Sequence, residues 1–461
     1  QTTNEKKILM EISLQKKIEK FNKIVKIPGD KSCSIRALLL ASQCIGISKI
    51  KNLLLSQDIL TTIKALQTLG VKITKSNNGK IYNVYGNGIN SFRTDKKIKI
   101  WLGNSGTLAR LLMGCLATHG GGKYYLYGDS SLNSRDMSRV TAGLEKVGAI
   151  VYYSKGKKTL PLTIEGTTMP LAQDHIHTLA SSQVKSSLLL SFLGCHGRSN
   201  LLELKPSRTH TEIILKKIAP NVIKIKKLRK GNLISVDGLK NLYALPKFYS
   251  IGNDPSSSAF LILLALLTPG SKLTLPGIIC NPTRIGFIQI LKKMNANIKI
   301  VKKKRDPNSG EVLGTIIVTG GRKLKPISVS KNIASFIDEL PLLFWASSWA
   351  RGTSKYHNCG ELVKKESNRL LEVKKILTQA GVRCKTTKDS MTIYGKEKIE
   401  SQNKSILVNC HHDHRINALA CIVALSSGIK TKIKNFDTST SFPSFISLIR
   451  NLGGKIEIRK N

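Results

Sequence analysis

Hydrophobic and polar positions along the chain repeat one pattern six times. A turn rich in Gly, Ser, Asp or Asn runs into a short segment that is mostly apolar on all sides, which is typical of a buried helix. The apolar portions of these segments are RALLLAS (36–42), LARLLMGCLA (108–117), VKSSLLLSFLG (184–194), SAFLILLALL (258–267), LLFWASSWA (342–350) and INALACIVAL (416–425). We predict a buried helix in each.

A second, amphipathic helix follows each of the first kind and ends at a small or turn residue before a β-rich run. These segments are ALQTLGVKI (from 65), GLEKVGAIV (from 143), ILKKIAPNVI (from 214), ILKKMNANIKI (from 290), VKKILTQAGVRC (from 373) and LIRNLGGKIEI (from 448). The β-rich runs alternate apolar and polar residues, as in Lys97–Ile100 and Lys455–Ile458, so one face of each sheet meets water. The pattern predicts helices inside and sheets outside.

The six helix pairs recur about every 70 to 85 residues, longer than most solenoid repeats, and favour two domains of three units each. The chain enters through a strand at Ile24–Ile27 whose partners we expect in the last units. We therefore predict a discontinuous first domain, residues 1–29 plus 253–461, with residues 30–252 inserted as the second domain. We also expect the positive N-terminal ends of the buried helices to converge on a cleft between these domains, where they would attract a polyanionic ligand.

The chain has 461 residues and a formal net charge of +46, from 74 Lys and Arg against 28 Asp and Glu. The Lys residues are spread along the whole chain, without a basic tail or the aromatic interleaving of stacking sites, so we expect no nucleic-acid partner. A basic nucleic-acid-binding protein stays open as an alternative.

The nine Cys residues are scattered without a C-x-x-C pair, which indicates a reduced, intracellular protein without a disulfide framework. The longest apolar run, Ala259–Thr268, is too short to span a bilayer. The amino end, Gln1–Lys26, lacks an apolar signal core. We expect a cytoplasmic protein that does not enter a membrane.

The segment Pro28–Arg36 is the strongest candidate for chemistry. A Gly-Asp turn opens an apolar helix with Lys31 at its mouth, and Ser32 and Arg36 are four residues apart on one face. A helix N-terminus offers free N–H groups and a partial positive charge, to which these side chains add full charges, so the segment suits an anion. The simpler alternative is an ordinary cap at Asp30 or Ser32 with two solvated cations.

Taken in order, the motifs resemble the enolpyruvyl transferases, and among them the 5-enolpyruvylshikimate-3-phosphate synthase family, in its bacterial class II branch. The matches run from Pro28 to Phe445. They are PGDKSCSIRALLLAS, LGNSGTLARLL, NSRDMSRV, SSQVKSSLLL, SRTHTE, NDPSSSAFL, NPTRIGF, IDELPLLFWAS, KKESNRL, DHRINAL and TSFPSF.

The resemblance implies an α/β fold of two domains, each with three βαβαββ units, buried parallel helices and outer sheets. It also implies transfer of the enolpyruvyl group of phosphoenolpyruvate to the 5-hydroxyl of shikimate 3-phosphate, with release of phosphate. No cofactor and no metal are expected. The partners would be these two small anionic substrates, and the protein would be a monomer.

The resemblance also assigns roles to individual residues. Asp338 would take the proton of the 5-hydroxyl, Glu366 would protonate the methylene carbon, and Lys31 would contact both substrates. Residues expected to bind shikimate 3-phosphate are Lys31, Ser32, Arg36, Ser181, Ser182, Gln183, Ser207, Asp338 and Lys365. Residues expected to bind phosphoenolpyruvate are Lys31, Asn104, Gly106, Arg135, Gln183, Arg369, His414 and Arg415.

Several of these residues also have simpler explanations. Asp338 before a helix could only complement the helix dipole, and the Lys364–Arg369 segment could be a solvated helix face. Lys365 and Arg369 are four apart, so we expect both to face one anion from one helix. Cys410, His411, His412 and His414 invite a metal interpretation, but their spacing does not favour a tetrahedral site.

Departures from the family pattern concentrate at 363–368, where Val363 and Lys364 replace the expected residues and Asn368 replaces an Asp. We expect weaker support for the site there, and a degenerate enzyme that keeps the fold stays open. Gly106 matches the position that leaves room for glyphosate, so we predict sensitivity. The nearest rival is the sister enzyme that acts on UDP-N-acetylglucosamine, but the loop Cys that it normally uses has no counterpart here.

Overall fold

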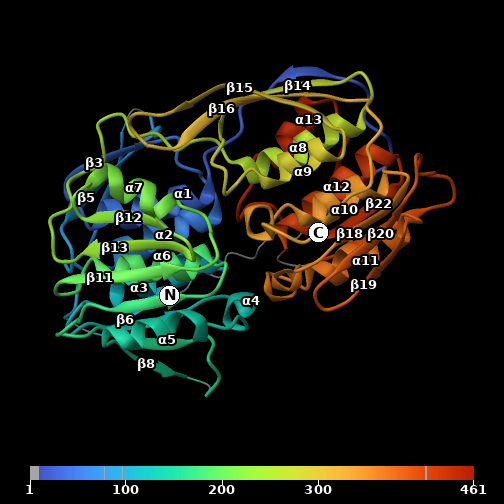
Figure 1. The fold of residues 1–461 in the computed structure, drawn as a ribbon. Coiled ribbons are helices and arrows are strands. Elements are labelled where there is room, and N and C mark those ends of the chain that lie inside the picture. The colour runs from blue at the N-terminus through green and yellow to red at the C-terminus, as the bar shows by residue number, and fades with distance from the viewer. Residues whose placement is uncertain (1–9, 77, 96, 155, 411–412, 461) are drawn as a thin grey trace. The chain divides into compact units, whose positions relative to one another are not determined.

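The computed structural model describes residues 10–76, 78–95, 97–154, 156–410 and 413–460 (Figure 1). The chain folds into two compact units. Of the described residues, unit 1 holds those up to Ile27, those from Pro255 to Lys303 and those from Gly314 onward, and unit 2 holds those from Pro28 to Asp254 and from Lys304 to Leu313. The short segment Lys304–Leu313, at the turn between strands β15 (Asn297–Arg305) and β16 (Val312–Thr319), therefore belongs with unit 2, whereas the predicted boundaries place it in the first domain.

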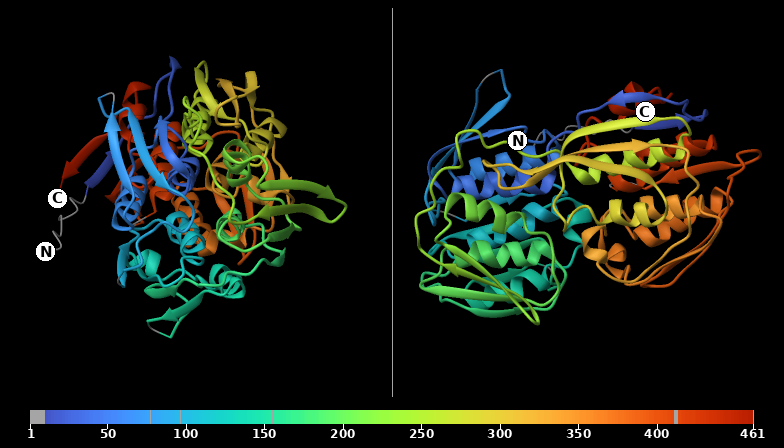
Figure 2. Two further views of the ribbon diagram at one scale, coloured as in Figure 1. Left: turned by 90° about the vertical axis from the view of Figure 1, so that its left-hand side faces the viewer. Right: turned by 45° about the horizontal axis from the view of Figure 1, so that its top comes forward.

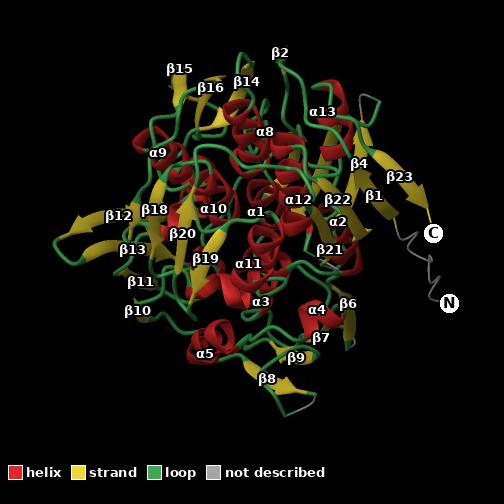
Figure 3. Ribbon diagram, turned by 90° about the vertical axis from the view of Figure 1, so that its right-hand side faces the viewer, coloured by secondary structure: helices red, strands yellow, loops and turns green. Residues whose placement is uncertain are grey.

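Buried helices form the core of each unit, and sheets flank them (Figure 3). In unit 2 they are α1 (Lys31–Ser42), α3 (Gly106–Leu116) and α6 (Ser182–Phe192). In unit 1 they are α8 (Pro255–Leu267), α10 (Leu340–Ser348) and α12 (His414–Ser427). Every residue of α8 is buried, as expected for a segment that is apolar on nearly every side. The predicted inside position of these helices is confirmed.

The amphipathic helices are also confirmed, and each shows one buried face. They are α2 (Gln57–Thr68), α5 (Ser138–Val147), α7 (His210–Ile218), α9 (Gly286–Lys293), α11 (Arg369–Gln379) and α13 (Phe445–Asn451). A further short helix, α4 (Ser130–Asn133), comes before α5.

Within the described residues the strands form six sheets, and most sheets repeat one topology. Two neighbouring strands run parallel, because a helix crosses between them, and the remaining strands are antiparallel. The sheet of β6 (Ile98–Trp101), β7 (Lys123–Tyr127), β9 (Leu162–Glu165) and β8 (Ile150–Tyr153) is an example. Together with the helix order, this topology confirms the predicted α/β architecture.

The other sheets of unit 2 have the orders β3-β5-β4 and β10-β11-β13-β12. Their strands are β3 (Ile45–Lys51), β4 (Lys72–Ser76), β5 (Ile81–Asn87), β10 (Asp174–His177), β11 (Arg198–Glu203), β12 (Ile223–Leu228) and β13 (Gly231–Asp237).

The sheets of unit 1 have the orders β15-β16-β14-β2, β17-β18-β20-β19 and β21-β22-β1-β23. Strands not yet given are β1 (Met10–Leu14), β2 (Asn22–Ile24), β14 (Lys272–Ile279), β17 (Ser328–Val329), β18 (Gly352–Tyr356), β19 (Arg383–Thr386), β20 (Met391–Gly395), β21 (Ser405–Asn409), β22 (Lys430–Phe436) and β23 (Glu457–Lys460).

The pairing of the amino-terminal strands differs from the prediction for Ile24–Ile27. Strand β2 ends at Ile24 and pairs in parallel with β14, which is not among the last elements. The strand that joins the last elements is β1, which lies between β22 and β23 and is antiparallel to both (Figure 2). The prediction was wrong because alternation within a strand does not identify its partner.

Among the residues that the structure describes, none of the helices is both long and apolar enough to cross a membrane.

Candidate functional site

The first turn of α1 carries the strongest sequence candidate. Asp30 is the N-cap, and its Oδ1 accepts a hydrogen bond from the Cys33 backbone N–H at 2.7 Å. The Lys31 Nζ lies 3.0 Å from Oδ2 of Asp58, a residue of α2 that is almost completely buried. The capping interpretation is therefore correct for Asp30, while Lys31 is partly buried and paired rather than a free solvated cation.

Arg36 lies one turn further along α1 and is buried. Its guanidinium donates to Ser32 O at 3.0 Å, to Ser186 Oγ at 3.0 Å and to Thr211 Oγ1 at 2.9 Å. Burial lowers the pKa of Arg36 to about 10, against the opposing effects of Cys33 and Asp30. The i to i+4 spacing of Ser32 and Arg36 brings them together as predicted, and Arg36 also joins α1 to α6 and α7.

The first turn of α3 holds a second group. Arg135 Nη2 donates to Asn104 Oδ1 and, at 3.2 Å, to Ser131 Oγ. Asn104 in turn donates through Nδ2 to Asp129 Oδ2 at 2.9 Å. A Cβ added at Gly106 would lie 3.0 Å from Arg135 Nη1, so the missing side chain at this position leaves room for the guanidinium.

Gln183 connects the N-terminal turns of α6 and α3. Its Oε1 accepts from Arg110 Nη1 at 2.7 Å, and its Nε2 donates to Thr107 Oγ1 at 2.9 Å. Arg110 was not a sequence candidate, although it lies four residues after Gly106 in the same helix. The spacing alone could have found it, because residues four apart in a helix face the same side.

The Ser candidates differ in their surroundings. Ser181 is the N-cap of α6 and is partly exposed, as is Ser182. Ser207 is buried, and both its N–H and its hydroxyl donate to Glu203 Oε1, at 3.0 and 2.8 Å. Hydrogen bonds of Arg36 and Gln183 thus connect the starts of α1, α3 and α6 within unit 2, and Ser207 lies on the loop that leads into α7.

In unit 1 the candidate residues gather around Arg369, which is 1% exposed. Its guanidinium lies 2.5 Å from Glu366 Oε2, 2.9 Å from Asp413 Oδ2 and 3.6 Å from Asp338 Oδ1. Burial acts to lower the pKa of Arg369, but the carboxylates of Asp413, Glu366 and Asp338 outweigh it and raise this pKa above its usual range.

Two further cationic side chains contact Asp338. Lys365 Nζ is 3.3 Å from its Oδ1, and Arg415 Nη1 donates to its backbone carbonyl at 3.3 Å. Arg415 also lies 3.7 Å from the buried carboxylate of Glu339. The structure therefore brings Asp338, Glu366, Lys365, Arg369 and Arg415 into one cluster, although they come from three separate segments.

Asp413, the residue before His414, was quoted in a motif but was not a candidate. It is fully buried, caps α12 through the N–H groups of Arg415 and Ile416, and accepts a hydrogen bond from Ser367 Oγ at 2.7 Å. His414 is also buried, and its Nδ1 is 3.2 Å from Thr440 Oγ1. His411 and His412 lie outside the described residues.

One expectation about this cluster is wrong. Lys365 and Arg369 do not share a helix, because α11 begins at Arg369 and Lys365 follows the short 3₁₀ turn Gly360–Lys364 in an extended conformation. They meet at Asp338 through the path of this loop. Asn368, expected to weaken the site, is the N-cap of α11 and accepts from the Leu371 N–H at 3.2 Å; Asn and Asp are about equally good caps.

Nearly the whole chain is similar to known proteins. The family model EPSP synthase (3-phosphoshikimate 1-carboxyvinyltransferase) matches residues 15–449. The 3-phosphoshikimate 1-carboxyvinyltransferase of Paramagnetospirillum magneticum is 35% identical over 93% of this chain and 94% of its own length. That of Ruthia magnifica is 36% identical over 94% of this chain and 96% of its own length.

Solved structures show the same similarity. The EPSP synthase of Acinetobacter baumannii is 30% identical and superimposes with a TM-score of 0.82 over 98% of this chain and all of its own. The enolpyruvyl transferase NikO of Streptomyces tendae, 12% identical, gives a TM-score of 0.77 over 98% of this chain and 99% of its own, and it shows the likeness of fold alone. The motifs, the fold and the relatives agree, and the chain belongs to the EPSP synthase (3-phosphoshikimate 1-carboxyvinyltransferase) family.

Proposed function

We propose that this chain transfers the enolpyruvyl group of phosphoenolpyruvate to the 5-hydroxyl of shikimate 3-phosphate, releasing phosphate. The observation that carries the proposal is the cluster of Asp338, Glu366, Lys365, Arg369 and Arg415 in unit 1. It combines two carboxylates with three cations, which is what the reaction of two anionic substrates requires. The relatives that match 93 to 94% of this chain carry the name of this activity.

The reaction needs an acid and a base near each other. In the addition step the methylene carbon of phosphoenolpyruvate gains a proton while the attacking hydroxyl loses one. Loss of a methyl proton and of phosphate from the adduct then restores the double bond. We assign proton removal from the 5-hydroxyl to Asp338 and protonation of the methylene carbon to Glu366, two carboxylates that share the Arg369 guanidinium.

The cations of unit 1 would hold the phosphoenolpyruvate. Arg415 is 12% exposed, so part of its guanidinium remains available to a carboxylate or phosphate. Arg369 is more deeply buried and is occupied by three carboxylates, so its contribution would come mainly from positioning Glu366. His414 would support the same anion from the start of α12, where the helix dipole adds positive potential.

Unit 2 would supply the remaining contacts. Lys31, Ser32, Ser181, Ser182, Gln183 and Ser207 would bind shikimate 3-phosphate, with Arg36 holding the starts of α1 and α6 in register. Asn104, Gly106 and Arg135 would form the part of the site that binds phosphoenolpyruvate, with Lys31 and Gln183 contacting both substrates. The starts of three helices would add backbone N–H donors for the phosphate groups.

The proposal extends to the setting in which the enzyme works. We propose that it acts as a monomer in the cytoplasm, with the two substrates as its ligands and without a nucleic-acid partner. Gel filtration with light scattering, and a gel-shift assay with DNA and RNA at physiological salt, test these points.

A single assay tests the reaction. The purified chain is incubated with phosphoenolpyruvate and either shikimate 3-phosphate or UDP-N-acetylglucosamine, and phosphate release and product mass are measured. We expect release only with shikimate 3-phosphate. Release only with the sugar nucleotide would identify the sister activity instead, and release with neither would indicate a degenerate enzyme.

Two variants connect this activity with the cluster. Asp338→Asn and Glu366→Gln should each lower kcat by about 10²- to 10⁴-fold, the usual contribution of an acid or base. Glu400→Gln, which changes an exposed carboxylate of the same unit, is the matched control and should leave kcat unchanged. Full activity in Asp338→Asn would contradict the assigned role.

A further inference from the structure

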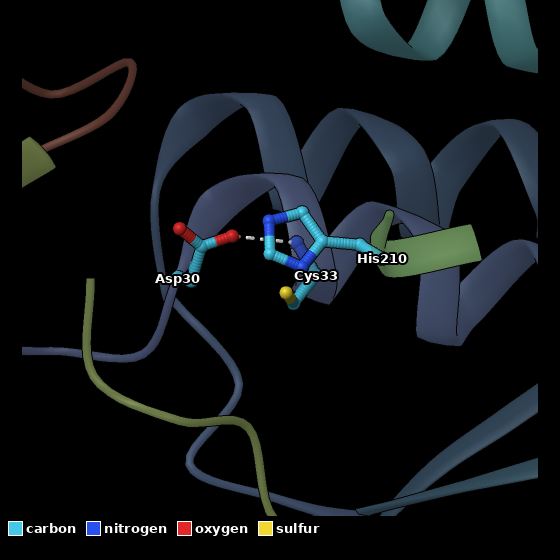
Figure 4. Close-up of side chains that lie close together, drawn as sticks. All are labelled: Asp30, Cys33 and His210. Atoms are coloured by element: carbon cyan, nitrogen blue, oxygen red, sulfur yellow. Dashed lines mark hydrogen bonds between the residues drawn. The ribbon is translucent and has the colours of Figure 1, made fainter. Parts of the chain in front are cut away.

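Three side chains of different chemistry that could each bind a metal ion lie close together at the start of α1. An oxygen of Asp30, the Sγ of Cys33 and a ring nitrogen of His210 all lie within 4.8 Å of one another (Figure 4). All three residues are buried. They come from the α1 N-terminus and from the first residue of α7, elements separated by about 180 residues of sequence. We propose that Asp30, Cys33 and His210 form a binding site for a thiophilic divalent cation of the zinc class.

The neighbour of His210 supports this assignment. Nδ1 of His210 is 2.6 Å from Oε1 of Glu311, and both side chains are nearly inaccessible to solvent. A carboxylate on one ring nitrogen fixes the orientation of the imidazole and directs the other nitrogen toward a metal, an arrangement common around zinc-bound histidines. Glu311 belongs to Lys304–Leu313, a segment of unit 2 whose neighbours along the chain on both sides belong to unit 1.

The donor set selects the class of ion. A thiolate and an imidazole favour zinc and similar soft or borderline ions, whereas calcium and magnesium prefer oxygen ligands alone. Carboxylate, thiolate and imidazole would leave a fourth tetrahedral position for water or an anion. Asp30, Glu311 and a Cys33 thiolate would carry negative charge. This charge would offset the two positive charges of the ion, and it would also offset nearby Lys31 and Arg36.

The three donor atoms lie almost as close together as the ligand atoms of a formed zinc site. Ligand atoms around tetrahedral zinc are about 3.3 to 3.8 Å apart, so side-chain shifts on the order of 1 Å complete the coordination. Asp30 can keep its cap on the Cys33 N–H while binding, because a carboxylate has about four acceptor positions. The Cys33 thiol would lose its proton on binding, so affinity should rise with pH.

Cobalt(II) titration of the full-length chain, freed of metal with a chelator, tests the site. We expect one equivalent to bind, with a thiolate-to-cobalt charge-transfer band that zinc abolishes by displacement. Cys33→Ser should remove the band, and Glu311→Gln should keep it but weaken binding about 10- to 100-fold, as loss of a supporting carboxylate does.

The matched control is Cys410→Ser, because Cys410 near His414 is the other candidate thiol. This variant should bind cobalt like the parent chain. A band that survives in Cys33→Ser or vanishes in Cys410→Ser would overturn the proposal, and so would the absence of any band.

A measurement on the unaltered chain covers the case in which a variant does not fold. Zinc X-ray absorption of the loaded protein should show one sulfur and otherwise nitrogen or oxygen ligands. Two or more sulfurs would place the metal elsewhere. Both measurements report the metal alone, so their outcome is independent of the proposed reaction.

Discussion

The Arg369 guanidinium and the Asp413 carboxylate form two hydrogen bonds, of 2.9 and 3.2 Å, in a place that excludes solvent from both side chains. A buried pair of this kind costs desolvation energy on both sides, but removal of one partner leaves an uncompensated charge. The pair also connects the start of α12 to the start of α11, and so holds Glu366 beside Arg369. Asp413 is thus a positioning residue for the proposed acid.

Asp413→Asn should destabilise unit 1 by up to about 3 kcal/mol, since Arg369 loses the most deeply buried of its three carboxylate partners while the amide can still cap α12. Urea unfolding followed by fluorescence measures the change. Glu372→Gln, which breaks the exposed pair with Lys375, should cost at most about 1 kcal/mol. Equal midpoints for the two variants would contradict the importance of burial.

Gly106→Ala should weaken phosphoenolpyruvate binding and leave the fold intact. The added Cβ would lie 2.9 Å from Arg110 Nη1 and 3.0 Å from Arg135 Nη1, so both guanidinium groups must shift. We expect a rise of about tenfold in KM, or about 1.4 kcal/mol, with a smaller change in kcat.

Glyphosate inhibition gives a second readout of the same variant. The parent enzyme should be inhibited in competition with phosphoenolpyruvate, and Gly106→Ala should be less sensitive. As a control, Gly79→Ala adds a methyl group where no atom lies within 4 Å, although its positive φ introduces some strain. Absence of competition in the parent enzyme would refute the expected sensitivity.

Unit 2 should lose stability as the pH falls from about 6.5 toward 4, because of His119. Burial lowers the pKa of His119 to about 4, against the opposing effect of the Cys115 carbonyl. The ring nitrogens contact Cys115 O at 2.8 Å and the Phe92 N–H at 3.2 Å, so a second proton would remove the acceptor for Phe92.

The direction follows from the two states. Above pH 6.5 the imidazole is neutral in the folded and in the unfolded chain. Below pH 6.5 the unfolded chain takes up a proton more readily than the folded chain, because the folded pKa is about 4. This difference lowers the free energy of unfolding by at most about 3 kcal/mol. Urea midpoints at pH 5 and pH 7 measure the loss. His119→Gln should reduce this pH dependence, and an unchanged dependence would assign it to other groups.

Lys185→Met should destabilise unit 2 by about 3 to 5 kcal/mol. Lys185 Nζ is fully buried between Glu203 and Glu212, at 2.8 and 2.7 Å, and its loss leaves two buried carboxylates without their cation. Because Glu203 also holds Ser207, the KM for shikimate 3-phosphate should rise. Arg198→Met, at an exposed pair with Asp237, is the matched control. Similar unfolding midpoints for the two variants would argue against the role of Lys185.

The sequence was sufficient for elements whose signal is local. Helix α8 could be predicted because nearly every position is apolar, and the amphipathic helices because one apolar stripe recurs at helical spacing. The candidate residues Asp338, Glu366 and Arg415 came from motifs, not from periodicity, and their proximity depends on three segments packing together.

Non-local features could not be predicted in this way. No property of Met10–Leu14 identifies β22 and β23 as its partners, because edges of similar strands present the same backbone groups. The i to i+4 rule failed for Lys365 because the Lys365–Asn368 loop, not a helix, joins it to Arg369. Asp413 was overlooked because an acidic residue before a helix most often serves as a cap, and its second role needs the position of Arg369.

The place of β1 between β22 and β23 has a consequence for folding during translation. Strand β22 is made roughly 420 residues after β1, a delay of about 20 to 80 seconds at ordinary translation rates. During that interval β1 has neither of its two strand partners, while unit 2 is synthesised and can fold. Because an unpaired strand edge can join other exposed strands, β1 is a point at which the chain can mispair during synthesis.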